Sequence, residues 1–194
     1  MREEAIAVLS ECFAPVSCEE WEAVTSAAAW SEFLAFLSCE AAPSARWDAA
    51  LVHLAVPPTY EEKTQFASRH FTGGLPGAAL PVESLYVSGV EPARQEYFQG
   101  SAWYMRDLAT ALGLEIPSAF AAYPDHLSVE LDMAAFLYAE NPEHARDFVA
   151  HRFEWLSPYI ARLNSLDTNA SFYVAVIELL RCLIDVWREE GVAR

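Results

Sequence analysis

Helix-start signals recur along this chain, and they constrain its fold more strongly than any other feature of the sequence. Ser17 and Thr59 each open a capping box, in which a hydroxyl group and the glutamate three residues later satisfy each other's backbone amides. Asn141 offers a cap that is followed by a proline at the first helical position, and Pro117 leads a further start. Four helix starts are therefore predicted from local chemistry alone.

The C-terminal segment has the clearest helical periodicity. Apolar residues recur there at spacings of three and four: Phe172, Val176, Leu179, Leu180, Leu183 and Trp187. Charged residues recur at the same spacings on the other side: Glu178, Arg181, Asp185 and Arg188. This pattern predicts one long helix with a buried face. No stretch alternates as a strand would, and no long period repeats, so we predict an all-α, single-domain helical bundle.

Glycines and prolines concentrate between Gly73 and Pro92. We predict one domain over residues 1–194, with an N-terminal helical part at about 1–70, a long Gly/Pro-rich loop at about 71–92 and a C-terminal helical part at about 93–194. Long loops in compact domains are usually either functional or disordered. An ordered functional segment is favoured by the apolar residues in this loop: Leu80, Val82, Leu85, Tyr86 and Val87.

The charge balance excludes some partners. The chain has 28 acidic residues against eleven Arg and one Lys, which gives a formal net charge of −16. Nucleic acid is not an expected partner, because phosphate binding depends on clustered Lys and Arg. An acidic surface suits a basic peptide, although solubility alone also explains it. With 54 % apolar residues and six Trp, the chain is expected to fold into a globular protein.

The sequence predicts a cytoplasmic protein without stable membrane insertion. No segment has the run of roughly 18 apolar residues that a membrane span needs, and the start, Met1 to Glu4, lacks the features of a secretory signal. The four cysteines show no CxxC spacing and lie mostly among apolar helical positions: Cys12, Cys18, Cys39 and Cys182. We expect reduced core thiols, and neither metal ligands nor a cofactor.

A distinctive motif, Asp125-His126, follows Tyr123-Pro124 and opens an amphipathic helix. An Asp at this place has a structural role as an N-cap that contributes about 1 kcal/mol. The positive end of the helix dipole favours a neutral His126 ring in the first turn, and a neutral ring both donates and accepts hydrogen bonds. The pair therefore serves either as a helix cap or as part of a binding site.

A small hydrolase is an alternative use of the same motif. It would take Asp125 and His126 as an acid-base pair, with Glu83 or Glu130 as a third member and Ser84 or Ser128 as nucleophile. Adjacent residues at a helix start point in different directions, and no G-x-S-x-G elbow is present. We therefore expect a protein that is not an enzyme and has no catalytic residues.

Other reactive patterns are weaker. His144, Asp147 and His151 share a helix face at spacings of three and four, but no fourth ligand or H-E-x-x-H pattern accompanies them. A solvated helix face explains them better, and no metal site is predicted. The sequence has no Walker A loop and no G-x-G-x-x-G motif, so it gives no support to nucleotide binding.

Two segments, in their order and separation, resemble the TorD/DmsD-type family of cytoplasmic redox-enzyme maturation chaperones. The first segment resembles three consecutive features of the family: an aromatic-and-Arg stretch, a Gly/Pro loop and a Pro-x-Glu-Ser-hydrophobic-Tyr run. The residues that match these features, in order, are Phe66, Arg69 and Phe71, then Gly73 to Gly77, then Pro81-Val82-Glu83-Ser84-Leu85-Tyr86. The second is matched by Asp125-His126-Leu127 with Glu130-Leu131. One departure is that Ala122-Tyr123 replaces the family's Glu-Pro, and the proline moves to position 124, which removes one acid from the expected site.

The resemblance implies a TorD-like all-helical protein, either a monomer or a domain-swapped dimer. Such a protein binds the N-terminal region of a molybdopterin oxidoreductase subunit, often a twin-arginine signal peptide, and holds the subunit until its cofactor is inserted, before export. One alternative within the fold is a factor like the nitrate reductase assembly proteins, which bind a mature N-terminus without a twin-arginine signal. The hydrolase that uses Asp125 and His126, and a generic helical adaptor, remain as other classes.

The expected site follows from the chemistry of a signal peptide. Two guanidinium groups followed by an apolar segment require carboxylates beside an apolar groove. The carboxylates expected to bind the arginines are Glu83, Asp125 and Glu130, and the residues expected to line the groove are Phe71, Leu75, Pro81, Tyr86 and Leu127. Ser84 and His126 complete the expected signal-peptide-binding set.

Overall fold

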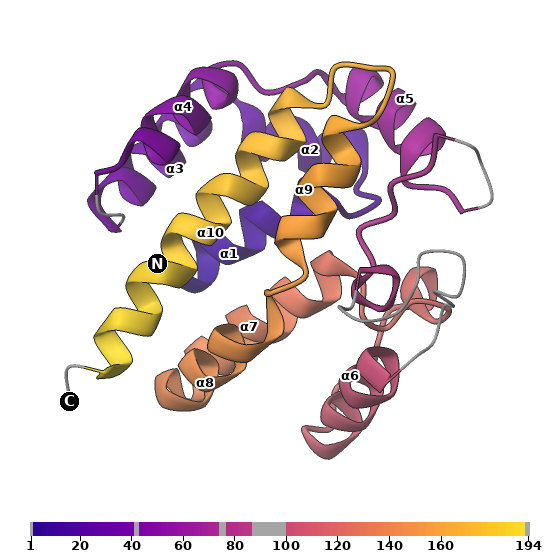
Figure 1. The fold of residues 1–194 in the computed structure, drawn as a ribbon, viewed down its shortest axis with the longest axis vertical. Helices are drawn as coiled ribbons and strands as arrows, with labels where there is room; N and C mark the ends of the chain where they lie inside the picture. Colours follow the sequence, from indigo (N-terminus) through magenta and orange to yellow (C-terminus); the bar gives the residue numbers. More distant parts are fainter. Residues whose placement is uncertain (1, 41–42, 74–76, 87–99, 193–194) are drawn as a thin grey trace.

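The computed structural model describes residues 2–40, 43–73, 77–86 and 100–192, and their fold is all-α, as predicted (Figure 1). The α-helices of these residues are α1 (Arg2–Glu11), α2 (Cys18–Thr25), α3 (Ala27–Glu40), α4 (Ala45–Leu54), α5 (Tyr60–His70), α6 (Gly100–Ala111), α7 (Leu127–Glu140), α8 (Pro142–Arg152), α9 (Leu156–Asn164) and α10 (Ser171–Val192). Two short 3₁₀ turns are η1 (Glu83–Leu85) and η3 (Ser118–Phe120).

Most of the expected helix starts are present. Ser17 and Thr59 form complete capping boxes with Glu20 and Glu62. The side chain of Asn141 accepts hydrogen bonds from two backbone amides at the start of α8. The start expected at Pro117 was wrong as a full helix, because only the single turn η3 follows it. Pro124 restricts the residue before it to extended conformations, which is unfavourable for continuing a helix from η3.

The long C-terminal helix α10 packs most extensively on α4 and also contacts α8 and α9 (Figure 1). Its predicted apolar face is buried at Val176, Leu179, Leu180, Leu183 and Trp187, while Phe172 is half-buried. The apolar side chains that are buried in the described helices form one core cluster, which includes residues of both α1 and α10.

The N-terminal helix α1 packs against α7, from the C-terminal half of the chain. A reciprocal pair of hydrogen bonds joins the two helices: Ser10 Oγ donates to the carbonyl of Ser128 at 3.2 Å, and Ser128 Oγ donates to the carbonyl of Ser10 at 3.1 Å. Both serines are buried among apolar side chains. The pair fixes how the two helices lie against each other, because each buried hydroxyl needs its partner.

The prediction of core thiols was right for Cys12 and Cys182 and wrong for Cys18 and Cys39, which are exposed. Cys18 is the first residue of α2 and its Sγ lies 3.4 Å from Glu22 Oε1, on the solvent side of that helix. Burial raises the pKa of the Cys12 thiol to about 12, so this thiol is inert at neutral pH.

Across the described helices, none is both long and apolar enough to cross a membrane. The described residues also contain no group of three or more His, Cys, Asp or Glu side chains placed to hold a metal ion. His144, Asp147 and His151 lie exposed along α8.

Candidate functional site

The two sequence motifs meet in space, and we call the contact between residues 81–86 and 125–130 the motif joint. Val82 and His126 form an isolated antiparallel bridge. Around it, each strand-like segment donates one backbone hydrogen bond to the other: Glu83 N to Asp125 O at 3.0 Å and Leu127 N to Pro81 O at 2.8 Å. Backbone pairing therefore connects the segment after α5 to the start of α7.

Asp125 lies inside the motif joint. Its Oδ2 atom accepts a hydrogen bond from the backbone N–H of Ser84 at 2.8 Å and another from the Ser84 hydroxyl. The side chain has no exposed surface, and Oδ1 has no hydrogen-bond partner among the described residues. The predicted role of Asp125 as helix cap was wrong, because Asp125 lies in a turn and the extended, bridged residue His126 is the N-cap of α7.

His126 is the N-cap of α7. Its Nδ1 atom accepts a hydrogen bond from the backbone N–H of Ser128 at 3.2 Å, so the ring proton is carried by Nε2. Burial lowers the pKa of His126 to about 3 and keeps the ring neutral at physiological pH. The predicted neutral ring is therefore confirmed, although its cause is desolvation rather than the helix dipole.

An ion cluster of Glu83, Glu130 and Arg152 lies next to the motif joint. The Nη2 atom of Arg152, the last residue of α8, pairs with the carboxylate of Glu83 and lies 3.4 Å from Glu130 Oε1. Trp155 Nε1 donates to Glu130 Oε2 at 3.1 Å. Burial, together with the nearby charge of Asp125, raises the pKa of Glu130 well above its usual range. Burial lowers the pKa of Arg152 to about 10. The ion pair of Arg152 and Glu83 is therefore largely desolvated, and burial favours the protonated, neutral form of Glu130.

The remaining predicted site residues surround the joint. Pro81 is buried, Leu127 is fully buried in the core, and Tyr86 is half-buried with its ring stacked on Trp155 at a centroid distance of 5.7 Å. Phe71 is half-buried against the rings of Phe13, Phe66 and Tyr173. Leu75 lies outside the described residues.

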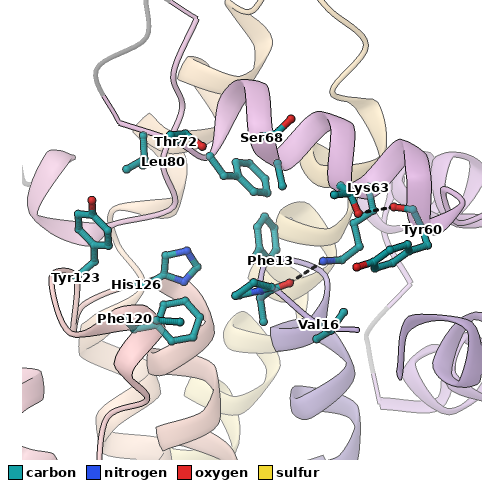
Figure 2. Close-up of a pocket in the computed structure, with 16 residues that line it drawn as sticks. Phe13, Val16, Tyr60, Lys63, Ser68, Thr72, Leu80, Phe120, Tyr123 and His126 are labelled. Carbon is teal, nitrogen blue, oxygen red and sulfur yellow. Dashed lines mark hydrogen bonds between the residues drawn. The ribbon is translucent and has the colours of Figure 1, made fainter. Parts of the chain in front are cut away.

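A cavity of about 350 Å³ lies beside the joint, and we call it the α5 cavity. Two of the predicted residues, Phe71 and His126, line it. Figure 2 shows His126 and Phe120 on one side of this space and Phe13 and Lys63 on the other. Most of the lining of the α5 cavity is apolar, so the cavity suits an apolar side chain of a ligand. A hydrogen-bond acceptor next to that side chain would pair with the N–H of His126 Nε2.

Lys63 is a residue of the α5 cavity that the sequence analysis missed. It is 5 % exposed and its Nζ atom donates to the carbonyl of Ala14 at 2.6 Å (Figure 2). Burial lowers its pKa. Its status as the single lysine of an acidic chain was a signal that could have drawn attention to it.

A second cavity of about 420 Å³ lies between α6 and the α7–α8 pair, and we call it the α6–α8 groove. Its apolar lining comes mainly from Tyr104, Leu108, Leu112, Leu137 and Phe148, and Arg152 reaches into it. The Arg152 guanidinium lies 4.7 Å from the centroid of the Tyr104 ring. Within the described ranges, the groove and the α5 cavity share no lining residue. Sequence analysis did not predict this groove, although it weighed three of its polar lining residues, His144, Asp147 and His151, as a metal constellation.

The arrangement does not resemble that of a hydrolase. The hydroxyl of Ser84 donates to Asp125, and Nδ1 of His126 is used by its own helix. Within the described part of the chain, no hydrogen bond connects His126 to either Ser84 or Asp125. The three side chains therefore form no chain from nucleophile to base to acid. Their observed chemistry is that of a structural connection beside cavities that accept apolar groups.

The described residues thus form an all-α protein in which two motif segments meet beside apolar cavities. Residues 27–169 match the family described as nitrate reductase delta subunit, and the chain belongs to this family. Both motifs lie inside the matched region. Its members are maturation chaperones for molybdoenzymes, which confirms the kind of family that the two motifs predicted. Comparison with curated proteins gave no significant match.

Proposed function

We propose that this protein is a cytoplasmic chaperone that binds the N-terminal twin-arginine region of a molybdopterin-dependent oxidoreductase subunit. It holds the subunit until the cofactor is inserted, before export. The single observation that carries this proposal is the motif joint, where three carboxylates lie beside cavities with apolar linings. The formal net charge of −16 adds long-range attraction for a basic peptide.

The residues of the proposed site divide into two groups. Phe71 and His126 line the α5 cavity and contact the peptide, with Nε2 of His126 as a donor to a peptide carbonyl. The proposed contact group also includes Leu75, Tyr86 and Glu83. The buried residues Pro81, Ser84, Asp125 and Leu127 act through the shape and charge of the joint, since they expose little or no surface. Glu130 is also buried in the free protein, beneath Arg152.

A second candidate function is binding of a mature N-terminus that has no twin-arginine signal. The match to the nitrate reductase delta subunit family favours it, because that name points to assembly of a nitrate reductase. The apolar cavities suit either client, so the two candidates differ in whether paired arginines are required.

Calorimetric titration separates the two candidates. The titrant is a peptide that carries a twin-arginine leader of a molybdopterin-dependent oxidoreductase subunit, and the matched control has both arginines changed to lysine. Guanidinium and ammonium groups differ in hydrogen-bond geometry, so a site built for arginine discriminates between them. We expect tight binding of the first and weak binding of the second. Equal binding would mean that the apolar segment alone is recognised, and no binding of either would favour the second candidate.

A further inference from the structure

The carboxyl groups of the ion cluster have more hydrogen-bond acceptors than Arg152 satisfies. Glu83, Asp125 and Glu130 lie in or beside the joint, and in the described part of the chain Arg152 pairs with Glu83 and Glu130. Among the described residues, Oδ1 of Asp125 has no donor, although the side chain is completely buried. Buried carboxylates need both charge balance and donors. The cluster is therefore suited to a further guanidinium.

Arg152 is held in a way that leaves it replaceable. It contacts both glutamates through Nη2 alone, and its Nε has no hydrogen-bond partner among the described residues. A guanidinium bound through its fork would make two parallel hydrogen bonds to one carboxylate and would be held more strongly. Arg152 is also the last residue of α8, and its side chain is 15 % exposed.

The α6–α8 groove gives access to this arginine from a surface that is already apolar. Large apolar side chains are exposed on and just after α6, at 48 % for Trp103, 46 % for Tyr104 and 38 % for Leu112. Tyr104 and Leu112 line the groove, together with Leu108, Leu137 and Phe148. The groove therefore places an apolar floor next to a guanidinium that covers two buried carboxylates, which matches a ligand with an arginine beside apolar residues.

We propose that the α6–α8 groove docks the arginine-bearing segment of the client, and that Arg152 is an internal competitor for Glu83 and Glu130. This inference rests on the proposed function. In the free protein Arg152 occupies the position between Glu83 and Glu130, and in the complex an arginine of the client takes its place with a two-pronged contact. Arg152 moves outward over Tyr104, whose ring face stabilises a guanidinium. The competition lowers affinity for any peptide that brings no arginine.

The first test changes the competitor. Arg152→Gln is titrated with the twin-arginine peptide, beside the wild type and Arg146→Gln. Arg146 lies on the same helix and donates to the carbonyl of Pro142, so its loss changes the net charge equally without touching the cluster. We expect Arg152→Gln to bind about tenfold more tightly and Arg146→Gln to stay within about twofold of the wild type. An unchanged or weaker affinity in Arg152→Gln would overturn the competition.

The second test asks whether an external guanidinium fills the place of Arg152. Removal of this arginine leaves buried Glu83 without its cation and Oε1 of buried Glu130 without its neighbouring donor, so Arg152→Gln is expected to be destabilised. Millimolar ethylguanidinium should raise the Tm of Arg152→Gln more than that of the wild type, and ethylammonium should do so less. Equal effects of the two cations would contradict a guanidinium site at this position.

The third test keeps Arg152 and changes the groove, so the docking proposal can still be tested if Arg152→Gln fails to fold. Leu112→Ser removes an exposed apolar side chain from the groove, and Val52→Ser removes one that is 72 % exposed on α4. We expect about fivefold weaker peptide binding for Leu112→Ser and less than twofold change for Val52→Ser. If the peptide binds the wild type and Leu112→Ser equally, the groove is not the docking surface. If it does not bind the wild type, the proposed function itself fails.

Discussion

Asp125→Ala is the substitution that best separates the motif joint from a simple helix cap. In the wild type Oδ2 accepts two hydrogen bonds from Ser84, one from its backbone and one from its hydroxyl. Hydrogen bonds to a charged group contribute about 1.5–3 kcal/mol each, and a buried donor left without an acceptor costs a similar amount. The substitution also removes the cost of burying a carboxylate close to Glu130, and this gain offsets part of the loss. We expect a decrease of about 3 kcal/mol in the free energy of unfolding, against about 1 kcal/mol for a lost cap.

The assay is urea unfolding at neutral pH, with Asn141→Ala as the matched control. Asn141 is a genuine cap, whose side chain accepts from the amides of Glu143 and His144, and its loss should cost about 1 kcal/mol. A double-mutant cycle of Asp125→Ala with Ser84→Ala should show a coupling of at least about 1 kcal/mol, because the two residues bond directly. A loss of no more than about 1 kcal/mol for Asp125→Ala, with no coupling to Ser84, would refute the reasoning.

The remaining predictions concern titration and packing. The pKa of Glu130 is raised in the folded state, so ionisation of Glu130 makes the free energy of unfolding fall as pH rises above the unfolded-state pKa of about 4.5. Glu130→Gln should remove this pH dependence in urea unfolding between pH 5 and 8. An unchanged slope would count against the raised pKa. The folded-state pKa of His126 is lowered to about 3, so stability should fall by up to about 1.4 kcal/mol per pH unit as pH decreases below about 6.5. His126→Gln should flatten that slope, and an NMR titration of the ring with a midpoint near 6.5 would contradict the burial argument. Leu180→Ala, on the buried face of α10, should cost about 2–5 kcal/mol in the same assay, and a cost below about 1 kcal/mol would show that the face is not packed as described.

Local chemistry was sufficient to predict several features of the fold. A capping box lies within four residues, so Ser17 and Thr59 marked their helices without any knowledge of the rest of the chain. The apolar stripe of α10 is likewise readable from spacing alone. Pro117 showed the limit of such signals, because a proline marks where a helix is allowed to start and not how far it continues.

The partners in the motif joint were beyond sequence reasoning. Glu130 was predicted as a site residue, but its contacts Arg152 and Trp155 lie 22 and 25 residues further along, on and after another helix. No periodicity or spacing links them, and their meeting depends on how α7 and α8 pack. The one-residue shift of the cap from Asp125 to His126 has the same origin, since it follows from a bridge to Val82.

The packing of α1 on α7 sets an order of events during synthesis. Ser10 and Ser128 are separated by 118 residues, and a ribosome that adds about 5–20 residues per second needs roughly 6–24 s to make that interval. Throughout this time Ile6 and Leu9, which end up almost completely buried, have no partner on α7. The nascent N-terminal helix must therefore be kept from aggregating until its partner leaves the exit tunnel, so this protein is exposed during its own synthesis to the hazard that a holding chaperone exists to prevent in others.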